Sequence, residues 1–257
     1  DFFSCFNISV MHVQDRLLFL ESLISAFSNL PYENVSKIIS FSENDKIEGA
    51  MRCPETVWEG YRKYGLGGTC FSLTNLLRVL LRRCAFRTSY FLADMRVAKD
   101  CHCGLIVHEN GVSYLIDPGY LILRPIDLSQ VPCRCTTQLN DVIITFESNR
   151  YHVFTETNHS GRKLRYSISS IFDEEEPFYA AWKRSFALNS MNSLCLNKVF
   201  GSEQVYFHRD KFRISTHNEK KNIAAKDTKI KLISEFFSID EHCIRKADEI
   251  LRGKRYD

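Results

Sequence analysis

The sequence contains no apolar run near the ~18–20 residues that a membrane span requires, so we expect no contact with a membrane. Its first residues, Asp1 to Ser4, show neither the basic start nor the apolar core of a secretory signal. The sequence also has no large excess of charge of one sign, since it contains 34 Lys and Arg and 31 Asp and Glu. This balance gives no indication of a nucleic-acid partner. No internal repeat or low-complexity tract occurs. What remains is an ordinary globular protein, with 44% hydrophobic residues to form a core.

Cysteine, in contrast, is abundant, with ten residues in 257. No small disulfide framework is evident at this length, which favours a reducing compartment and a cytoplasmic location. Two Cys-x-Cys pairs, Cys101/Cys103 and Cys133/Cys135, offer four thiolates to a zinc ion. Structural zinc ligands are usually separated by two to four residues, so this spacing is a weak signal. We therefore expect no bound metal.

Cys70 is the strongest candidate for chemistry. It follows Gly67-Gly68, and glycine permits a tight turn because it accepts positive φ without steric cost. A helical period of apolar residues comes next, at Leu73, Leu76, Leu77, Leu80, Leu81 and Cys84. Cys70 is thus predicted at a helix N-terminus, where the helix dipole and free N–H groups favour the nucleophilic thiolate.

A predicted hairpin brings two further polar residues together. Asn110-Gly111 lies between apolar, β-branched runs, the strongest short-range hairpin signal. If these two residues form the loop, the numbers of opposed residues sum to 221. His102 and Asp117 then become diagonal neighbours on one face, roughly 7–8 Å apart at Cα. A carboxylate there holds an imidazole in one tautomer and stabilises its cation.

Each of these residues also has an ordinary structural explanation. A cysteine on an apolar helix is usually a small buried hydrophobe. A histidine near a strand end is more often a satisfied polar group, and an aspartate before Pro-Gly is usually a turn residue. Taken together with the Gly-Gly turn and the hairpin geometry, the three residues favour a catalytic triad of Cys70, His102 and Asp117.

These motifs resemble the arylamine N-acetyltransferase family. That family has an Arg-Gly-Gly-Trp-Cys-Phe-type nucleophile motif, a downstream His opening a strand, and an Asp-x-Gly-Phe-type motif. The corresponding segments here are Leu66–Phe71, His102 and Asp117–Tyr120, with upstream Leu30–Asn34 similar to the family's Pro-Phe-Glu-Asn and weaker landmarks at 130–132 and 189–193. The chain differs from the usual family residues at Leu66, Thr69, Ser72 and Leu121.

The resemblance implies an α+β fold in three parts. They are an N-terminal helical bundle (1–84), a central antiparallel β-barrel (85–177) and a C-terminal α/β lid (178–257), around a transglutaminase-like cysteine-enzyme core. It implies that Cys70 takes an acetyl group from acetyl-CoA and passes it to an arylamine, hydrazine or related amine. His102 would move the protons and Asp117 would orient His102. The residues implied at the substrate pocket are Phe71, Gly119, Tyr120, Ser190 and Ser193.

Two alternatives stay open at this point. The same triad order occurs in transglutaminase-like folds, so a cysteine hydrolase or amide-exchange enzyme is one. A binding module of the same fold, with its site altered at the four differing positions, is the other. The Pro31-Tyr32-Glu33-Asn34 landmark favours the acetyltransferase.

Periodicity outlines the remaining elements. Helical patterns occur in 12–30, 53–64 and 229–251. Short β-type runs with brief turns suggest a barrel or sandwich, at 89–97, 104–107, 112–116, 141–146, 151–155 and 163–168. Two later runs, 204–207 and 212–215, are also strand-like, and the acidic stretch 173–177 is predicted to be a surface connection.

Overall fold

The computed structural model describes residues 1–8, 15–137 and 139–253. Its N-terminal part is helical except for one two-residue strand, β1 (Tyr32–Glu33). The helices are α1 (Phe2–Cys5), α2 (Arg16–Phe27), α3 (Val35–Glu43), α4 (Ile47–Ala50), α5 (Pro54–Tyr64) and α6 (Cys70–Arg83). The helical patterns at 12–30 and 53–64 correspond to α2 and α5, with residues 9–14 outside the described part. Among the described residues, no helix is both long and apolar enough to cross a membrane.

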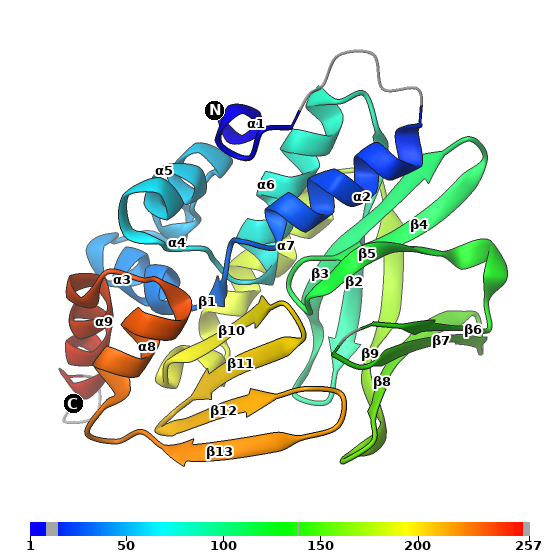
Figure 1. Cartoon of the computed structure of the whole chain (residues 1–257). Coiled ribbons are helices and arrows are strands. Elements are labelled where there is room, and N and C mark those ends of the chain that lie inside the picture. The colour runs from blue at the N-terminus through cyan, green and yellow to red at the C-terminus, as the bar shows by residue number, and fades with distance from the viewer. Residues whose placement is uncertain (9–14, 138, 254–257) are drawn as a thin grey trace.

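The middle of the chain forms one strongly curved antiparallel sheet of eight strands in the order β5-β4-β3-β2-β9-β8-β7-β6 (Figure 1). The strands are β2 (Arg87–Met95), β3 (Ala98–Glu109), β4 (Val112–Asp117), β5 (Ile122–Asp127), β6 (Cys133–Thr136), β7 (Asp141–Glu147), β8 (Arg150–Thr157) and β9 (Gly161–Phe172). Six correspond to the predicted runs. The two edge strands, β5 and β6, were missed because Pro125 and the Cys-Arg-Cys sequence of β6 depart from an apolar alternation.

The C-terminal part adds a second antiparallel sheet in the order β1-β10-β11-β12-β13, so the N-terminal β1 is its edge strand. Its strands are β10 (Cys195–Phe200), β11 (Glu203–His208), β12 (Lys211–Ser215) and β13 (Lys220–Ala224), accompanied by helices α7 (Glu176–Arg184), α8 (Lys229–Phe237) and α9 (Glu241–Gly253). Three short 3-10 helices lie at Leu128–Gln130, Ser185–Ala187 and Asn189–Asn192. The combination of helices and antiparallel sheets confirms the predicted α+β fold class.

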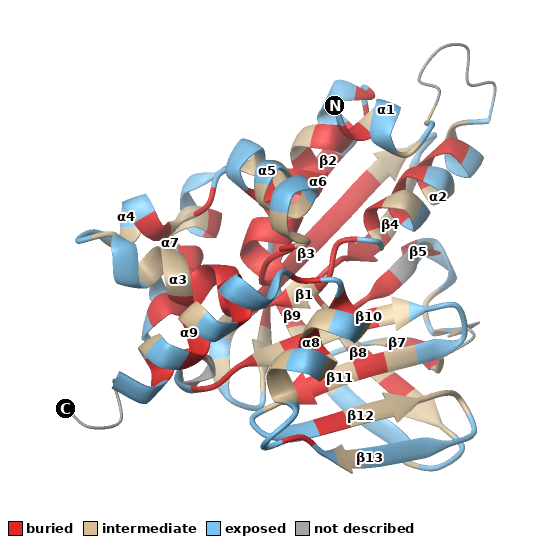
Figure 2. Ribbon diagram, turned by 60° about the vertical axis from the view of Figure 1, so that its left-hand side comes forward, coloured by how far each residue is buried: buried red, intermediate tan, exposed pale blue. Residues whose placement is uncertain are grey.

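Helix α6 lies at the centre of the larger hydrophobic core. All six members of its predicted apolar stripe are buried, and they pack in one cluster with residues of β2 and β3 (Figure 2). Alternation along β3 decides which way its side chains point. Cys103, Leu105 and Val107 belong to this helix-facing core, whereas Ile106 belongs to a second core inside the curved sheet. His102 shares the inner face with Ile106.

Candidate active site

Cys70 begins α6, directly after the Gly67-Gly68 turn. The sequence-based reason for these glycines was wrong, because neither has a positive φ. Close packing requires them instead. A Cβ added to Gly67 would lie 1.9 Å from the Pro31 carbonyl oxygen, and one on Gly68 would lie 2.1 Å from Ser72 Oγ. The backbone contact therefore requires glycine at position 67, whereas a side chain at position 68 would displace the Ser72 hydroxyl.

A buried arginine from outside the motif supports this turn. Arg52 Nη1 donates a hydrogen bond to the Gly67 carbonyl at 2.7 Å and lies 3.9 Å from the buried Glu33 Oε1. The Glu33 backbone N–H in turn donates to the Gly68 carbonyl at 2.9 Å. Position 66, where the resemblance leads one to expect an arginine, is a buried leucine. Arg52 thus supplies a guanidinium beside the turn from a different place in the chain.

The β3–β4 hairpin has the predicted register, with Leu105 opposite Ile116 and Glu109 opposite Val112. It places His102 beside Asp117, with 2.7 Å between His102 Nε2 and Asp117 Oδ2. The exposed fractions of the two residues are 3% and 0%, so water does not compete for this contact. The second oxygen, Asp117 Oδ1, accepts a hydrogen bond from the Tyr120 backbone N–H at 2.8 Å. The carboxylate is therefore fixed at both oxygens.

The loop after β4 closes against the thiol and the imidazole together. A Cβ added to Gly119 would lie 2.5 Å from Cys70 Cβ and 3.2 Å from His102 Cε1. Leu121, which stands where the family motif usually has a second glycine, has φ +59°. A side chain in this left-handed region costs roughly 1–2 kcal/mol. The loop keeps the backbone shape of a glycine although it carries a leucine.

The electrostatics of the site favour an ion pair between thiolate and imidazolium. A hydrogen bond from the Cys103 thiol, together with His102, holds the pKa of Cys70 well below its usual range despite burial. Burial disfavours the charged imidazole, but the charge and hydrogen bond of Asp117 outweigh it and raise the pKa of His102 to about 10. At neutral pH the site therefore holds a nucleophilic sulfur beside a proton donor.

We expect this ion pair to appear in the pH dependence of Cys70 alkylation. Because the Cys70 pKa is lowered, its rate constant with iodoacetamide should already be at its plateau at pH 7. An ordinary thiol titrates near 8.5 and still gains rate there. The measurement is a peptide-resolved alkylation time course from pH 5 to 9, with a cysteine-containing peptide as reference. A Cys70 rate that rises in parallel with the reference would contradict the ion pair.

A cavity of about 440 Å³ opens onto Cys70 and His102. All three parts of the chain line it. The N-terminal part contributes Tyr32 and Cys70; the barrel contributes Met95, Cys101, His102, Gly119, Tyr120, Leu121, Leu139, Asn140, Thr155 and Arg165; the C-terminal sheet contributes Cys195, Asn197, Gln204, Tyr206 and Arg213. Cys70 and His102 thus face a cavity of the size that small-molecule ligands occupy, with Asp117 buried behind His102.

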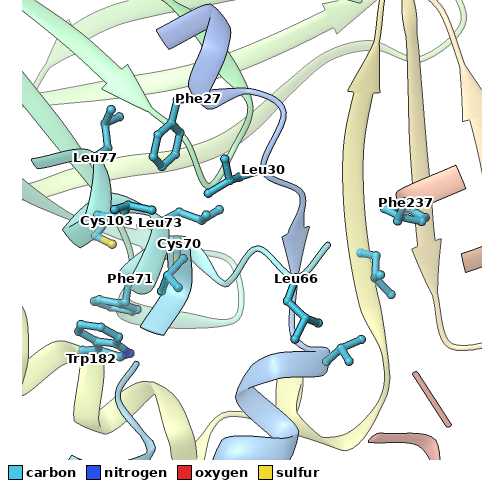
Figure 3. Packing of buried hydrophobic residues seen from close by; sticks show 14 of the residues in the cluster. Phe27, Leu30, Leu66, Cys70, Phe71, Leu73, Leu77, Cys103, Trp182 and Phe237 are labelled. Carbon is cyan, nitrogen blue, oxygen red and sulfur yellow. The ribbon is translucent and has the colours of Figure 1, made fainter. Parts of the chain in front are cut away.

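The other residues expected at the pocket have separate positions. Gly119 and Tyr120 line the cavity. Phe71 instead lies in the helical core, with its ring centroid 6.3 Å from that of Trp182 (Figure 3). Ser193 is buried away from the cavity wall, and its Oγ lies 3.3 Å from His208 Nε2. Ser190 is in the 3-10 helix Asn189–Asn192, and its side chain lies outside the described residues.

Sequence reasoning missed several residues of the site. The buried Tyr166 has its ring centroid 4.8 Å from that of His102. Burial, reinforced by the Asp117 charge, raises the Tyr166 pKa well above its usual value. Arg165 and Arg213 reach the cavity from β9 and β12. No motif or spacing distinguishes these three from other strand residues, so only the folded arrangement identifies them.

The cysteine pairs do not assemble. All ten cysteines are free thiols. Cys103 packs against α6, where its Sγ lies 3.6 Å from Thr74 Oγ1. Cys101 lines the cavity, although alternation predicted that it would point away from the face of His102. In the described part of the chain, no three His, Cys, Asp or Glu side chains are grouped as a metal site would require.

No protein-family model matches this chain, and no sequence relative was found among curated proteins. Solved structures, however, are similar over nearly the whole chain. An arylamine N-acetyltransferase from M. tuberculosis is 17% identical and superimposes with a TM-score of 0.78, covering 95% of this chain and 94% of its own. The enzyme from Mycobacterium marinum is 14% identical with a TM-score of 0.80, covering 98% of each chain.

A third similar structure has a different third residue in its triad. An arylamine N-acetyltransferase from Bacillus cereus, described with a unique Cys-His-Glu catalytic triad, is 18% identical with a TM-score of 0.72, covering 93% of this chain and 97% of its own. At such identities the likeness concerns the fold. This chain has the fold of the arylamine N-acetyltransferases from its N-terminal helices to its C-terminal sheet.

Proposed function

We propose that this protein is a cysteine-dependent acyltransferase that moves an acetyl or other acyl group from acyl-CoA to an arylamine, hydrazine or related amine. The observation that carries the proposal is the placement of Cys70 at the start of α6, against a buried His102–Asp117 pair, at the wall of a cavity. The fold shared with arylamine N-acetyltransferases supports it.

In the first half-reaction the Cys70 thiolate attacks the thioester carbonyl. The new C–S bond forms as the bond to the CoA sulfur breaks, and His102 gives its proton to the departing CoA thiolate. Negative charge develops on the carbonyl oxygen during the attack. The Thr69 side chain does not cap α6, so the first N–H groups of the helix are available to stabilise that oxygen.

In the second half-reaction the acceptor amine attacks the acyl carbonyl on Cys70. His102, now neutral, takes a proton from the amine, and the acyl–sulfur bond breaks to release the amide and restore the thiolate. Asp117 holds the imidazole through Nε2, which leaves Nδ1 for exchange with sulfur and substrate. Both halves use one site in turn, which is a ping-pong mechanism.

The cavity favours this reaction over the alternatives. A volume of about 440 Å³, with walls from all three parts of the chain, suits a small amine better than the extended polypeptide that a transglutaminase-like enzyme would accept. The lowered pKa of Cys70 supports catalysis rather than binding alone. Ten free thiols support our proposal that the protein works in a reducing compartment such as the cytoplasm.

Incubation with acetyl-CoA in the absence of an acceptor tests the proposal. We expect intact-mass and peptide-map measurements to show one acetyl group on Cys70, which an aromatic amine or hydrazine then removes. Longer acyl-CoA donors extend the test to acyl length. If no acyl-CoA modifies Cys70 while iodoacetamide still does, the acyl-CoA donor is rejected and amide substrates become the next choice.

A further inference from the structure

Two arginine side chains project into the cavity from opposite parts of the chain. Arg165 comes from β9 of the barrel and Arg213 from β12 of the C-terminal sheet. None of the described residues that line the cavity is acidic. Within the described chain, neither guanidinium takes part in an ion pair within 4.0 Å. The cavity therefore contains two positive charges that the protein itself does not neutralise.

The local structure holds Arg165 toward the cavity. Leu164 pairs with Phe154 and Tyr166 pairs with Val153, so Arg165 is the extra residue of a β-bulge. Bulges re-aim a side chain and are common next to functional sites. Arg165 Nε donates to Thr155 Oγ1 at 2.5 Å, and its Cζ lies 5.7 Å from the ring centroid of Tyr120. Its guanidinium also forms a hydrogen bond with the Tyr120 side chain, which lines the same cavity.

Arg213 is held differently but leaves donors unused. Its Cζ lies 4.7 Å over the ring of Tyr206, which stands opposite it in the neighbouring strand. Arg213 Nε is buried without a hydrogen-bond partner among the described residues. A buried donor without a partner is costly, and charged donors more so. Because this nitrogen has no accessible surface, an anion in the cavity would be bound by the other nitrogens of the guanidinium.

The position of the two arginines limits which anion they can bind. The ring centroid of Tyr120 lies 6.0 Å from that of His102, so Arg165 is one aromatic ring away from the triad. The phosphates of CoA are separated from the thioester by the whole pantetheine arm, which is longer than the one-ring separation between Arg165 and the triad. The anion beside these arginines therefore belongs to the reacting part of a substrate. A planar carboxylate matches the guanidinium fork.

We propose that Arg165 and Arg213 bind a carboxylate carried by one of the two substrates, and so make the site selective for an acidic acceptor amine or for the acyl-CoA of a dicarboxylic acid. This inference rests on the proposed acyltransferase function and names its substrate class. The two sources share one chemistry, carboxylate on guanidinium, and differ only in which half-reaction shows the preference.

The test compares matched pairs of substrates in each half-reaction. For the donor, the acylation rate of Cys70 is measured with succinyl-CoA and with butyryl-CoA. For the acceptor, release of the acyl group is measured with 4-aminobenzoate and with 4-aminobenzamide. We expect the carboxylate to be preferred about ten- to hundredfold in kcat/KM in one arm, the size expected of charge-assisted hydrogen bonds. The arm that shows it identifies the source.

Variants connect the preference to the two arginines. The Arg165→Gln/Arg213→Gln double variant should lose the preference, measured as the ratio of kcat/KM for the two substrates of a pair, and each single variant should lose part of it. Arg162→Gln is the control, since Arg162 lies on β9 over Phe154 and outside the cavity. No preference in the wild type, with transfer to the neutral substrates intact, would overturn the proposal, as would a preference unchanged in the double variant.

A binding measurement separates this inference from the proposed function. If no CoA thioester acylates Cys70, the acyltransferase function fails, but ligand binding in the cavity can still be measured. Benzoate should then protect Cys70 from iodoacetamide at least tenfold better than benzamide, and the double variant should lose that difference. Equal protection by benzoate and benzamide would refute the carboxylate site independently of any turnover.

Discussion

Replacing Cys70 with serine is expected to lower acyl transfer by about 10⁴-fold or more, the loss seen when a catalytic nucleophile is removed. In the wild-type site the proton already resides on His102, whose pKa is raised to about 10. A thiol beside this imidazole gives up its proton, whereas a serine hydroxyl does not. The variant would therefore present a neutral, weakly nucleophilic oxygen to the thioester.

The measurement is steady-state turnover with acetyl-CoA and an aromatic amine, together with the thermal unfolding midpoint. The unfolding midpoint should change little, because serine is close to cysteine in size and Cys70 packs at the first turn of α6. Cys53→Ser is the matched control, since Cys53 is an exposed thiol outside the cavity. Turnover of Cys70→Ser within tenfold of the wild type would show that the nucleophile is another residue.

Asp117→Asn is expected to lower acyl transfer by about 10⁴-fold, as in triads where the same exchange leaves the geometry intact. The carboxylate accepts from His102 Nε2 and from the Tyr120 N–H. An amide keeps only one oxygen for these two donors. It also removes the charge that favours the imidazolium, so the His102 pKa should fall and the Cys70 pKa should rise.

This second change gives a measurement beyond the rate. The pH midpoint for Cys70 alkylation should move upward in Asp117→Asn, toward the value of an ordinary thiol. Asp127→Asn is a suitable control, because Asp127 ends the neighbouring β5. Its side chain caps the 3-10 helix Leu128–Gln130 by accepting hydrogen bonds from the Ser129 N–H and hydroxyl. An unchanged midpoint together with wild-type turnover would leave Asp117 as a turn residue without a part in the chemistry.

The parts of the site that sequence reasoning predicted are those set by local rules. The five leucines after Cys70 establish the helix, and Asn110-Gly111 fixes the register that brings His102 to Asp117, fifteen residues along the chain. Each of these relationships stays within one helix or one hairpin. A period or a turn residue is then sufficient to predict it.

The parts that were missed depend on contacts between distant segments. Arg52 reaches the Gly67 carbonyl, Tyr166 packs on His102, and Arg213 enters the cavity from the second sheet. Nothing in the residues near each of them indicates these partners, because the curvature of the barrel and the docking of the C-terminal sheet determine them. Phe71 is a residue that sequence reasoning placed wrongly. Its position next to the nucleophile led us to expect it in the pocket, but the helix directs its side chain into the core.

The two-residue strand β1 has a consequence for anyone who redesigns this pocket. On one side Tyr32 pairs with Asn197 of β10, and on the other it bridges to Gly68 in the turn before the nucleophile. The C-terminal sheet is thus connected, through a single short strand, to the backbone that positions the Cys70 sulfur. Removing part of this sheet to widen the pocket would therefore also make the position of Cys70 less well defined. Exchanging side chains on β10 to β12 leaves that connection intact, and is the route by which substrate range can change while the chemistry is preserved.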